Sequence, residues 1–133
     1  MSVRSGQLSI RIPPDAAQVA AVRAFVGAVG RQAGCSEETI DDLRLVATEA
    51  CAQAIEEDVA LDGIEVRTVL DEAGRLVLEI QPTGSFERPP EGLDGSSGPS
   101  TSTRRALIEG LFPDAEFDPR GGVLRVGASP QDD

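Results

Sequence analysis

The apolar positions in the first part of the chain follow a helical period. Between Asp15 and Gly34, valines recur every three or four residues, so they share one face of a helix. Asp15 can cap the first turn with its carboxylate, and Gly34 suits the end of the helix. We therefore expect a helix across this segment. Its apolar face is formed by Val19, Val22, Val26 and Val29, with Phe25 beside them.

A second helix is expected from Ser36, which can cap it, to Glu57. Glu49 and Gln53 stand four residues apart in it, so their side chains are neighbours on one flank. Leu45 and Ala52 share that flank, and small or apolar residues beside a carboxylate are unusual where a helix faces only solvent. The flank is therefore a candidate for a pocket or a partner. The apolar stripe centred on Ala47 is Ile40, Leu43, Ala50, Cys51 and Ala54.

Several short segments alternate apolar and polar residues, as half-buried strands do. Pro13 and Pro14 end the first of them, and the sequence Asp71-Glu72-Ala73-Gly74 between the second and third predicts a hairpin. The last two segments are expected to close the sheet as a second hairpin. The predicted strands are residues 7–12, 63–70, 75–80, 115–117 and 123–126.

A segment rich in Gly, Pro and Ser interrupts the pattern at residues 82–100. Neither a helix nor a ladder strand is expected to persist through it. A loop of this length inside a small domain is usually functional or disordered, so we predict a lid-like loop. Thr101 or Thr103 can cap a short helix that runs to Phe112, and the tail at 129–133 is expected to fray.

The order of these elements is strand, helix, helix, hairpin, loop, helix, hairpin. At 133 residues the chain has about the commonest size of a single domain, so residues 1–133 are expected to share one core. Helices that alternate with antiparallel pairs predict an α/β fold. Its architecture would be a two-layer sandwich, with a mixed, mostly antiparallel sheet and the helices on one face.

The charge of the chain restricts its partners and its chemistry. The formal net charge is −11, whereas nucleic-acid binding rests on a basic surface, so a basic protein is the better partner. All positive residues are Arg, because the sequence contains no Lys and no His. Imidazole catalysis, Schiff-base chemistry and a Lys phosphate clamp are therefore excluded.

Cys35 and Cys51 lack the spacing of a metal site, and Cys51 lies on the apolar stripe. Two buried or semi-buried thiols in a reducing compartment are the simplest interpretation. The N-terminus shows no signal-peptide pattern, and no segment approaches the ~20 apolar residues of a membrane helix. We therefore expect a cytoplasmic protein that does not contact the membrane.

The order of elements and the motif LRLVATEACAQAI at residues 43–55 resemble the GHKL, or histidine-kinase-like ATPase, fold. The likeness spans nearly the whole chain and is specifically to the bacterial anti-sigma factor serine kinases. In that family's N-box helix, a Glu acts as general base, and an Asn four residues later holds the magnesium ion that bridges the nucleotide phosphates. The resemblance assigns the base role to Glu49. It assigns the metal role to Gln53, whose amide lies one methylene further out than that of Asn.

The other nucleotide motifs are altered in this chain. The family's Asp-x-Gly-x-Gly, whose Asp reads the adenine amino group, is matched by Gln81-Pro82-Thr83-Gly84-Ser85, with Gln81 in place of the Asp. The Gly-rich segment whose amides cradle phosphates is replaced by residues 98–105. Gly84 and the side chains of Thr103, Arg104 and Arg105 are then the candidate nucleotide contacts. The family's Gly-Gly-Thr before the last strand is matched by Gly121-Gly122-Val123.

These departures predict weak or no binding of ATP and Mg²⁺. The leading hypothesis is an anti-sigma-like protein that binds a sigma factor and is released by an anti-anti-sigma factor, with Arg23 as a candidate contact for the partner's carboxylates. One alternative is an active serine-protein kinase that phosphorylates the anti-anti-sigma factor with Glu49 as base. Another is an orphan regulatory module on the same fold. The resemblance also implies a homodimer. Each candidate residue taken alone also fits an ordinary surface role.

Overall fold

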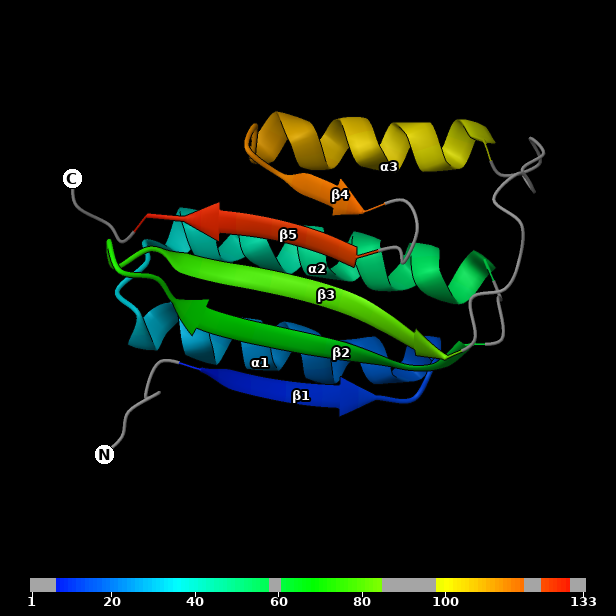
Figure 1. The fold of residues 1–133 in the computed structure, drawn as a ribbon, viewed down its shortest axis with the longest axis horizontal. Coiled ribbons are helices and arrows are strands. Elements are labelled where there is room, and N and C mark those ends of the chain that lie inside the picture. The colour runs from blue at the N-terminus through cyan, green and yellow to red at the C-terminus, as the bar shows by residue number, and fades with distance from the viewer. Residues whose placement is uncertain (1–6, 58–60, 85–97, 119–122, 130–133) are drawn as a thin grey trace.

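The computed structural model describes residues 7–57, 61–84, 98–118 and 123–129. The strands form one layer, and helices α1 and α2 lie together behind it as a second layer (Figure 1). In chain order the elements are β1 (Leu8–Ile12), the 3-10 turn η1 (Ala16–Gln18), α1 (Val19–Gln32), α2 (Glu37–Glu57), β2 (Leu61–Leu70), β3 (Leu76–Gly84), α3 (Gly98–Leu111), β4 (Glu116–Asp118) and β5 (Val123–Ala128).

The strands form an open sheet in the order β1-β2-β3-β5-β4. Every pair of neighbouring strands described in it is antiparallel, so the sheet that we expected to be mixed and mostly antiparallel contains no parallel pair within these strands. Ile80 in the middle of β3 stands opposite Val66 of β2 and Leu124 of β5. All three side chains are buried, which places the core on the face that α1 and α2 cover. The predicted α/β architecture is confirmed.

Helices α1 and α2 pack closely because a glycine stands where their axes approach. A Cβ added at Gly30 would lie 2.9 Å from Cγ1 of Ile40, and the Ile40 side chain is fully buried. The predicted apolar faces of both helices are confirmed, since Val22 and Val26 of α1 are buried against the same core as Leu43 of α2. None of the helices within the described ranges is long and apolar enough to cross a membrane.

The caps expected at Asp15 and Ser36 and the turn expected between β2 and β3 are present. Oδ1 of Asp15 accepts a hydrogen bond from the Ala17 amide, although the first turn is a 3-10 turn before α1 proper. Oγ of Ser36 accepts one from the Thr39 amide and so caps α2. Gly34 and Gly74 have φ of 86° and 84°, values that a residue with a side chain rarely adopts. Glycine is therefore needed at the end of α1 and in the β2–β3 turn.

The second face of the sheet carries charges that alternate in sign. Glu79 of β3 stands directly opposite Arg67 of β2 on one side and Arg125 of β5 on the other, and Arg125 in turn faces Glu116 of β4. Glu79 lies 3.6 Å from Arg67 and 3.8 Å from Arg125. Opposite charges in cross-strand pairs stabilise a solvated sheet surface, so this face is stable without a second layer of helices.

The loop predicted at 82–100 is too long at both ends. Strand β3 continues through Pro82 to Gly84 and pairs with β2, and helix α3 begins at Gly98. β5 pairs with β3 only from Leu76 to Ile80. At Pro82, this edge of β3 has no neighbour among the described strands, so the lack of an amide proton on Pro82 is tolerated there. Thr101 and Thr103 lie inside α3 and do not cap it. The remainder of the predicted loop, the Gly-Gly motif at 121–122 and most of the tail lie outside the described residues.

Both cysteines are free and belong to the core. Cys51 is fully buried, and burial raises the pKa of its thiol to about 12. Burial also raises the pKa of the Cys35 thiol. The thiolate is the reactive form of cysteine, and these thiols stay protonated at neutral pH. The prediction of two buried thiols is confirmed, and both serve as core side chains.

Candidate functional site

Helix α2 sets the position of the candidate site. Its buried face contacts the core through Ile40, Leu43, Ala47 and Cys51, as the stripe predicted, and Val46 is buried as well. Glu49 and Gln53 are both half-buried on the flank outside that stripe. Helix α3 lies along this flank and runs in the opposite direction to α2 (Figure 1). The predicted flank therefore faces another element of the same chain.

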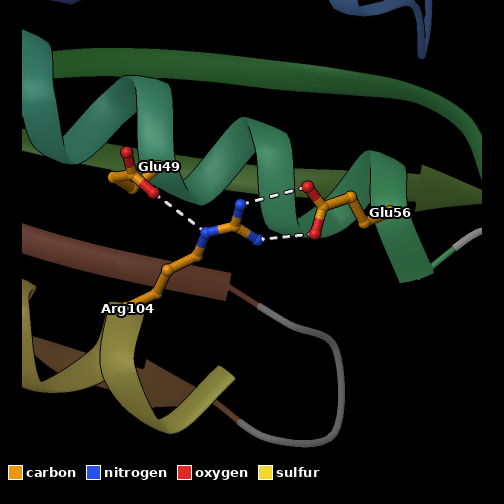
Figure 2. A network of polar contacts seen from close by, with 3 residues as sticks. All are labelled: Glu49, Glu56 and Arg104. Carbon is orange, nitrogen blue, oxygen red and sulfur yellow. Dashed lines mark hydrogen bonds and ion pairs between the residues drawn. The ribbon is translucent and has the colours of Figure 1, made fainter. Parts of the chain in front are cut away.

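Arg104 connects the two helices. Its Nε donates a hydrogen bond of 2.9 Å to Oε1 of Glu49, while its two terminal nitrogens donate to the two oxygens of Glu56 at 2.9 and 3.1 Å. Figure 2 shows the guanidinium extending from α3 between the two carboxylates of α2. The side chains of Arg104 and Glu49 are only 18% and 27% exposed. We call these three residues the Arg104 cluster.

The electrostatics of the Arg104 cluster favour its charged form. The hydrogen bond from Arg104 lowers the pKa of Glu56, and its positive charge acts in the same direction. The hydrogen bond to Glu56 raises the pKa of Arg104; burial opposes this shift, and the hydrogen bond to Glu49 adds to it. A bidentate pair between Arg and a carboxylate is among the stronger hydrogen-bonded contacts in proteins. Because it contains two carboxylates and one guanidinium, the cluster keeps a net negative charge.

Gln81 does not join this site. It stands between Ile80 and Pro82, both buried, and is itself exposed, so its side chain lies on the charged face of the sheet. α1 and α2 cover the opposite face, and the sheet separates Gln81 from Glu49. The residue at this strand end that faces the helices is Pro82, whose side chain has no hydrogen-bonding group. Gln81, which the motif match assigns to the adenine position, therefore lies on the opposite face of the sheet from α2 and its Glu49 and Gln53.

The two consecutive arginines of α3 point in different directions. Arg105 lies over the ring of Phe117 in β4, with 4.2 Å from its guanidinium carbon to the ring centre, and its Nε is 3.3 Å from Glu109. Arg104 alone reaches Glu49. The prediction that both arginines contact a bound anion together is not supported by this geometry, because consecutive helical residues project about 100° apart. Thr103 is exposed on the same helix.

The remaining predicted residues lie apart from the Arg104 cluster. Gly84 ends β3 with a φ of 138° and is paired with Leu61 at the start of β2. Arg23 is exposed on α1 and forms none of the ion pairs found among the described residues. Gln53 stays beside Glu49 on α2, as the spacing predicted. Within the described ranges, no three acidic, Cys or His side chains gather as a metal site would require.

Glu56 is the residue of this site that sequence reasoning missed. Its side chain is 59% exposed, as expected of a solvated helix carboxylate, yet it accepts two hydrogen bonds from Arg104. A signal was available, because Glu49 and Glu56 stand seven residues apart and share one side of a helix. Two carboxylates in that relation favour a facing cation. The sequence did not indicate which Arg would supply it.

Comparison with known proteins agrees with this architecture. The family model for the histidine kinase-like ATPase domain matches residues 12–127, from the end of β1 to the last strand. The match includes α2 with Glu49 and Gln53, and α3 with Arg104. No curated protein matches the sequence.

Proposed function

We propose that this chain, which belongs to the histidine kinase-like ATPase domain family, is a regulatory protein that binds a sigma factor without using ATP. Family membership supports the fold and its candidate site. The narrower function rests on the resemblance of residues 43–55 to the anti-sigma factor serine kinases and on the chemistry of the site. In this proposal, a competing anti-anti-sigma factor releases the sigma factor.

The observation that carries the proposal is the contact between Glu49 and Arg104. A general base has to reach the proton that it removes, directly or through one water molecule. Here Oε1 of Glu49 accepts a hydrogen bond of 2.9 Å from Arg104 within the protein, and the Glu49 side chain is only 27% exposed. A kinase mechanism with Glu49 as base would require this contact to open. The geometry therefore favours a binding role over phosphoryl transfer.

The residues present do not fit Mg·ATP. Gln81, which stands at the family's adenine-reading position, faces away from the helices, and the neighbouring residue that faces them is Pro82, whose side chain has no hydrogen-bonding group. Magnesium requires near-ideal octahedral geometry at short distance, which the longer Gln53 side chain provides less readily than Asn. The net negative charge of the Arg104 cluster also disfavours an incoming phosphate. We therefore derive no catalytic step through ATP.

A sigma factor fits the charge of the chain. The net charge of −11 complements the basic DNA-binding faces of such a protein and would speed association at low ionic strength. Arg23, exposed on α1 and without an ion pair among the described residues, is available to a carboxylate of the partner. Arg31 of the same helix is already paired with Glu37 at 3.4 Å.

The test is a binding titration of the purified chain against each sigma factor of its native cell, with and without Mg·ATP. We expect one sigma factor to bind equally tightly in both conditions. Arg23→Ala should weaken binding by about tenfold, the loss typical of a significant interface contact, while the matched variant Arg31→Ala should change it little. Binding that requires ATP, or transfer of phosphate to an anti-anti-sigma protein that Glu49→Ala abolishes, would favour the kinase. Failure of every sigma factor to bind would favour an orphan module.

A further inference from the structure

Helix α3 has a small apolar anchor. Of its side chains at positions 103–111, which the structure describes, only Ile108 is buried; Leu111 is half-buried and Leu107 is 39% exposed. By comparison, α1 buries four valines over its 14 residues. Helix stability within a protein comes mostly from tertiary packing of an apolar face. Within positions 103–111, an interaction besides the burial of Ile108 therefore contributes to holding α3 against α2.

Arg104 supplies that interaction at the right place. It lies one turn before Ile108. Its three hydrogen bonds join α3 to Glu49 and Glu56, which stand about two turns apart on α2. Its side chain is 18% exposed, so solvent screens the cluster less than an ordinary surface ion pair. Hydrogen bonds to charged partners that are partly buried are stronger than neutral ones.

We infer that Arg104 is an internal cation that holds α3 closed against α2 through Glu49 and Glu56. The guanidinium already donates a hydrogen bond to Oε1 of Glu49, the residue that the family resemblance assigns as base. The inference rests on the proposal that the chain works without ATP, and it adds that the conformation of α3 is fixed by the sequence and not controlled by nucleotide.

Hydrogen exchange of the whole, ligand-free chain tests this inference, because amide exchange reports local opening of a helix. In Arg104→Gln, the amides of α3 should exchange roughly tenfold faster or more, as expected when partly buried charged hydrogen bonds are lost. The matched variant Arg105→Gln removes a neighbouring exposed contact and should change them by less than about threefold. Amides of α1 and of the central strands should be unchanged in both variants, which establishes that the fold is intact.

A second comparison of variants distinguishes loss of the ion pairs of the Arg104 cluster from loss of packing by the Arg104 side chain. In the background Glu49→Gln with Glu56→Gln, Arg104→Gln should add less than about threefold to the exchange of α3, because its partners are already neutral. Equal effects of Arg104→Gln and Arg105→Gln, or a full Arg104→Gln effect in that background, would overturn the inference. So would protection of α3 by Mg·ATP in the unaltered chain. None of these exchange measurements involves a sigma factor, so failure of the partner proposal would be seen separately.

Discussion

Arg104 and Arg105 are adjacent in sequence but serve different parts of the molecule. One contacts two carboxylates of α2, and the other lies over Phe117 of β4. The sequence identified both as candidate anion ligands, since two arginines near a helix start are suited to phosphate. It could not indicate their directions, because these depend on how α3 is rotated about its axis when it packs. The rotation is set by Ile108, whose buried position is a tertiary feature.

Glu56 allows a prediction on pH. Its pKa is lowered from an ordinary value of about 4.5 by the hydrogen bond from Arg104, so the folded state holds the proton less tightly than the unfolded state. The stabilisation is therefore complete at neutral pH and is lost as the pH falls below that ordinary value and through the folded pKa. Because Glu56 is 59% exposed, we expect only about 0.5 kcal/mol.

The measurement compares the free energy of unfolding of the unaltered chain with that of Glu56→Gln, by urea denaturation at pH 7 and at pH 3. At pH 7 the unaltered chain should be the more stable one. At pH 3, below the ordinary pKa of Glu56, the difference should be smaller, because the unfolded state is then protonated and the advantage of the ionised folded state is being lost. A difference of the same size at both pH values would contradict the role of the ionised carboxylate.

At the scale of elements, local signals gave most of the fold. The caps at Asp15 and Ser36 and the alternation of the strands are local features, so the sequence was sufficient for them. The bounds of β3 and α3 were wrong because composition alone suggested a loop. Pairing with β2 carries β3 through Pro82 to Gly84, and such pairing between distant segments is not visible in a local window.

The packing of α1 on α2 gives a second prediction at this scale. Gly30→Ala would place a Cβ 2.9 Å from the buried Ile40 side chain, which has no free space to move into. We expect a loss of about 1–3 kcal/mol in the free energy of unfolding, as overpacking typically causes. Thermal or urea denaturation measures it.

Gly110 in α3 is the matched control, because a Cβ added there would meet no atom within 4 Å. Gly110→Ala should be neutral or stabilise the chain by up to about 1 kcal/mol, since Ala favours a helix more than Gly does. Equal stability of the Gly30→Ala and Gly110→Ala variants would contradict the close approach of α1 and α2 at Gly30.

At the scale of the whole molecule, the sheet separates two different surfaces. One face packs against α1 and α2 and forms the core, and α2 also carries the two carboxylates of the Arg104 cluster. The other face carries paired charges. The motif match assigned Gln81 to the adenine-reading position, and the structure places its side chain on the charged face. A shift of one residue along a strand reverses the face of every side chain. Motif matching had no means to detect it, whereas the pattern of buried neighbours does.

The family and the general site were accessible from the sequence, but the state of the site was not. Residues 43–55 predicted α2 and placed Glu49 and Gln53 together on it, and the family match covers this helix. The hydrogen bond from Arg104 to Glu49 joins two residues that stand 55 positions apart in the chain. Only the folded arrangement reveals that the residue expected to act as a base is already engaged as an ion-pair partner.

Calorimetric titration of the ligand-free protein with Mg·ATP tests most directly the proposal that the chain does not use ATP. A matched titration with the Arg104→Gln variant would show whether the Arg104 cluster alone blocks the site. We expect no binding heat in the unaltered chain up to about 1 mM nucleotide, where binding would still be worth about 4 kcal/mol. Saturable binding of Mg·ATP in the micromolar range would contradict the proposal that the chain works without ATP.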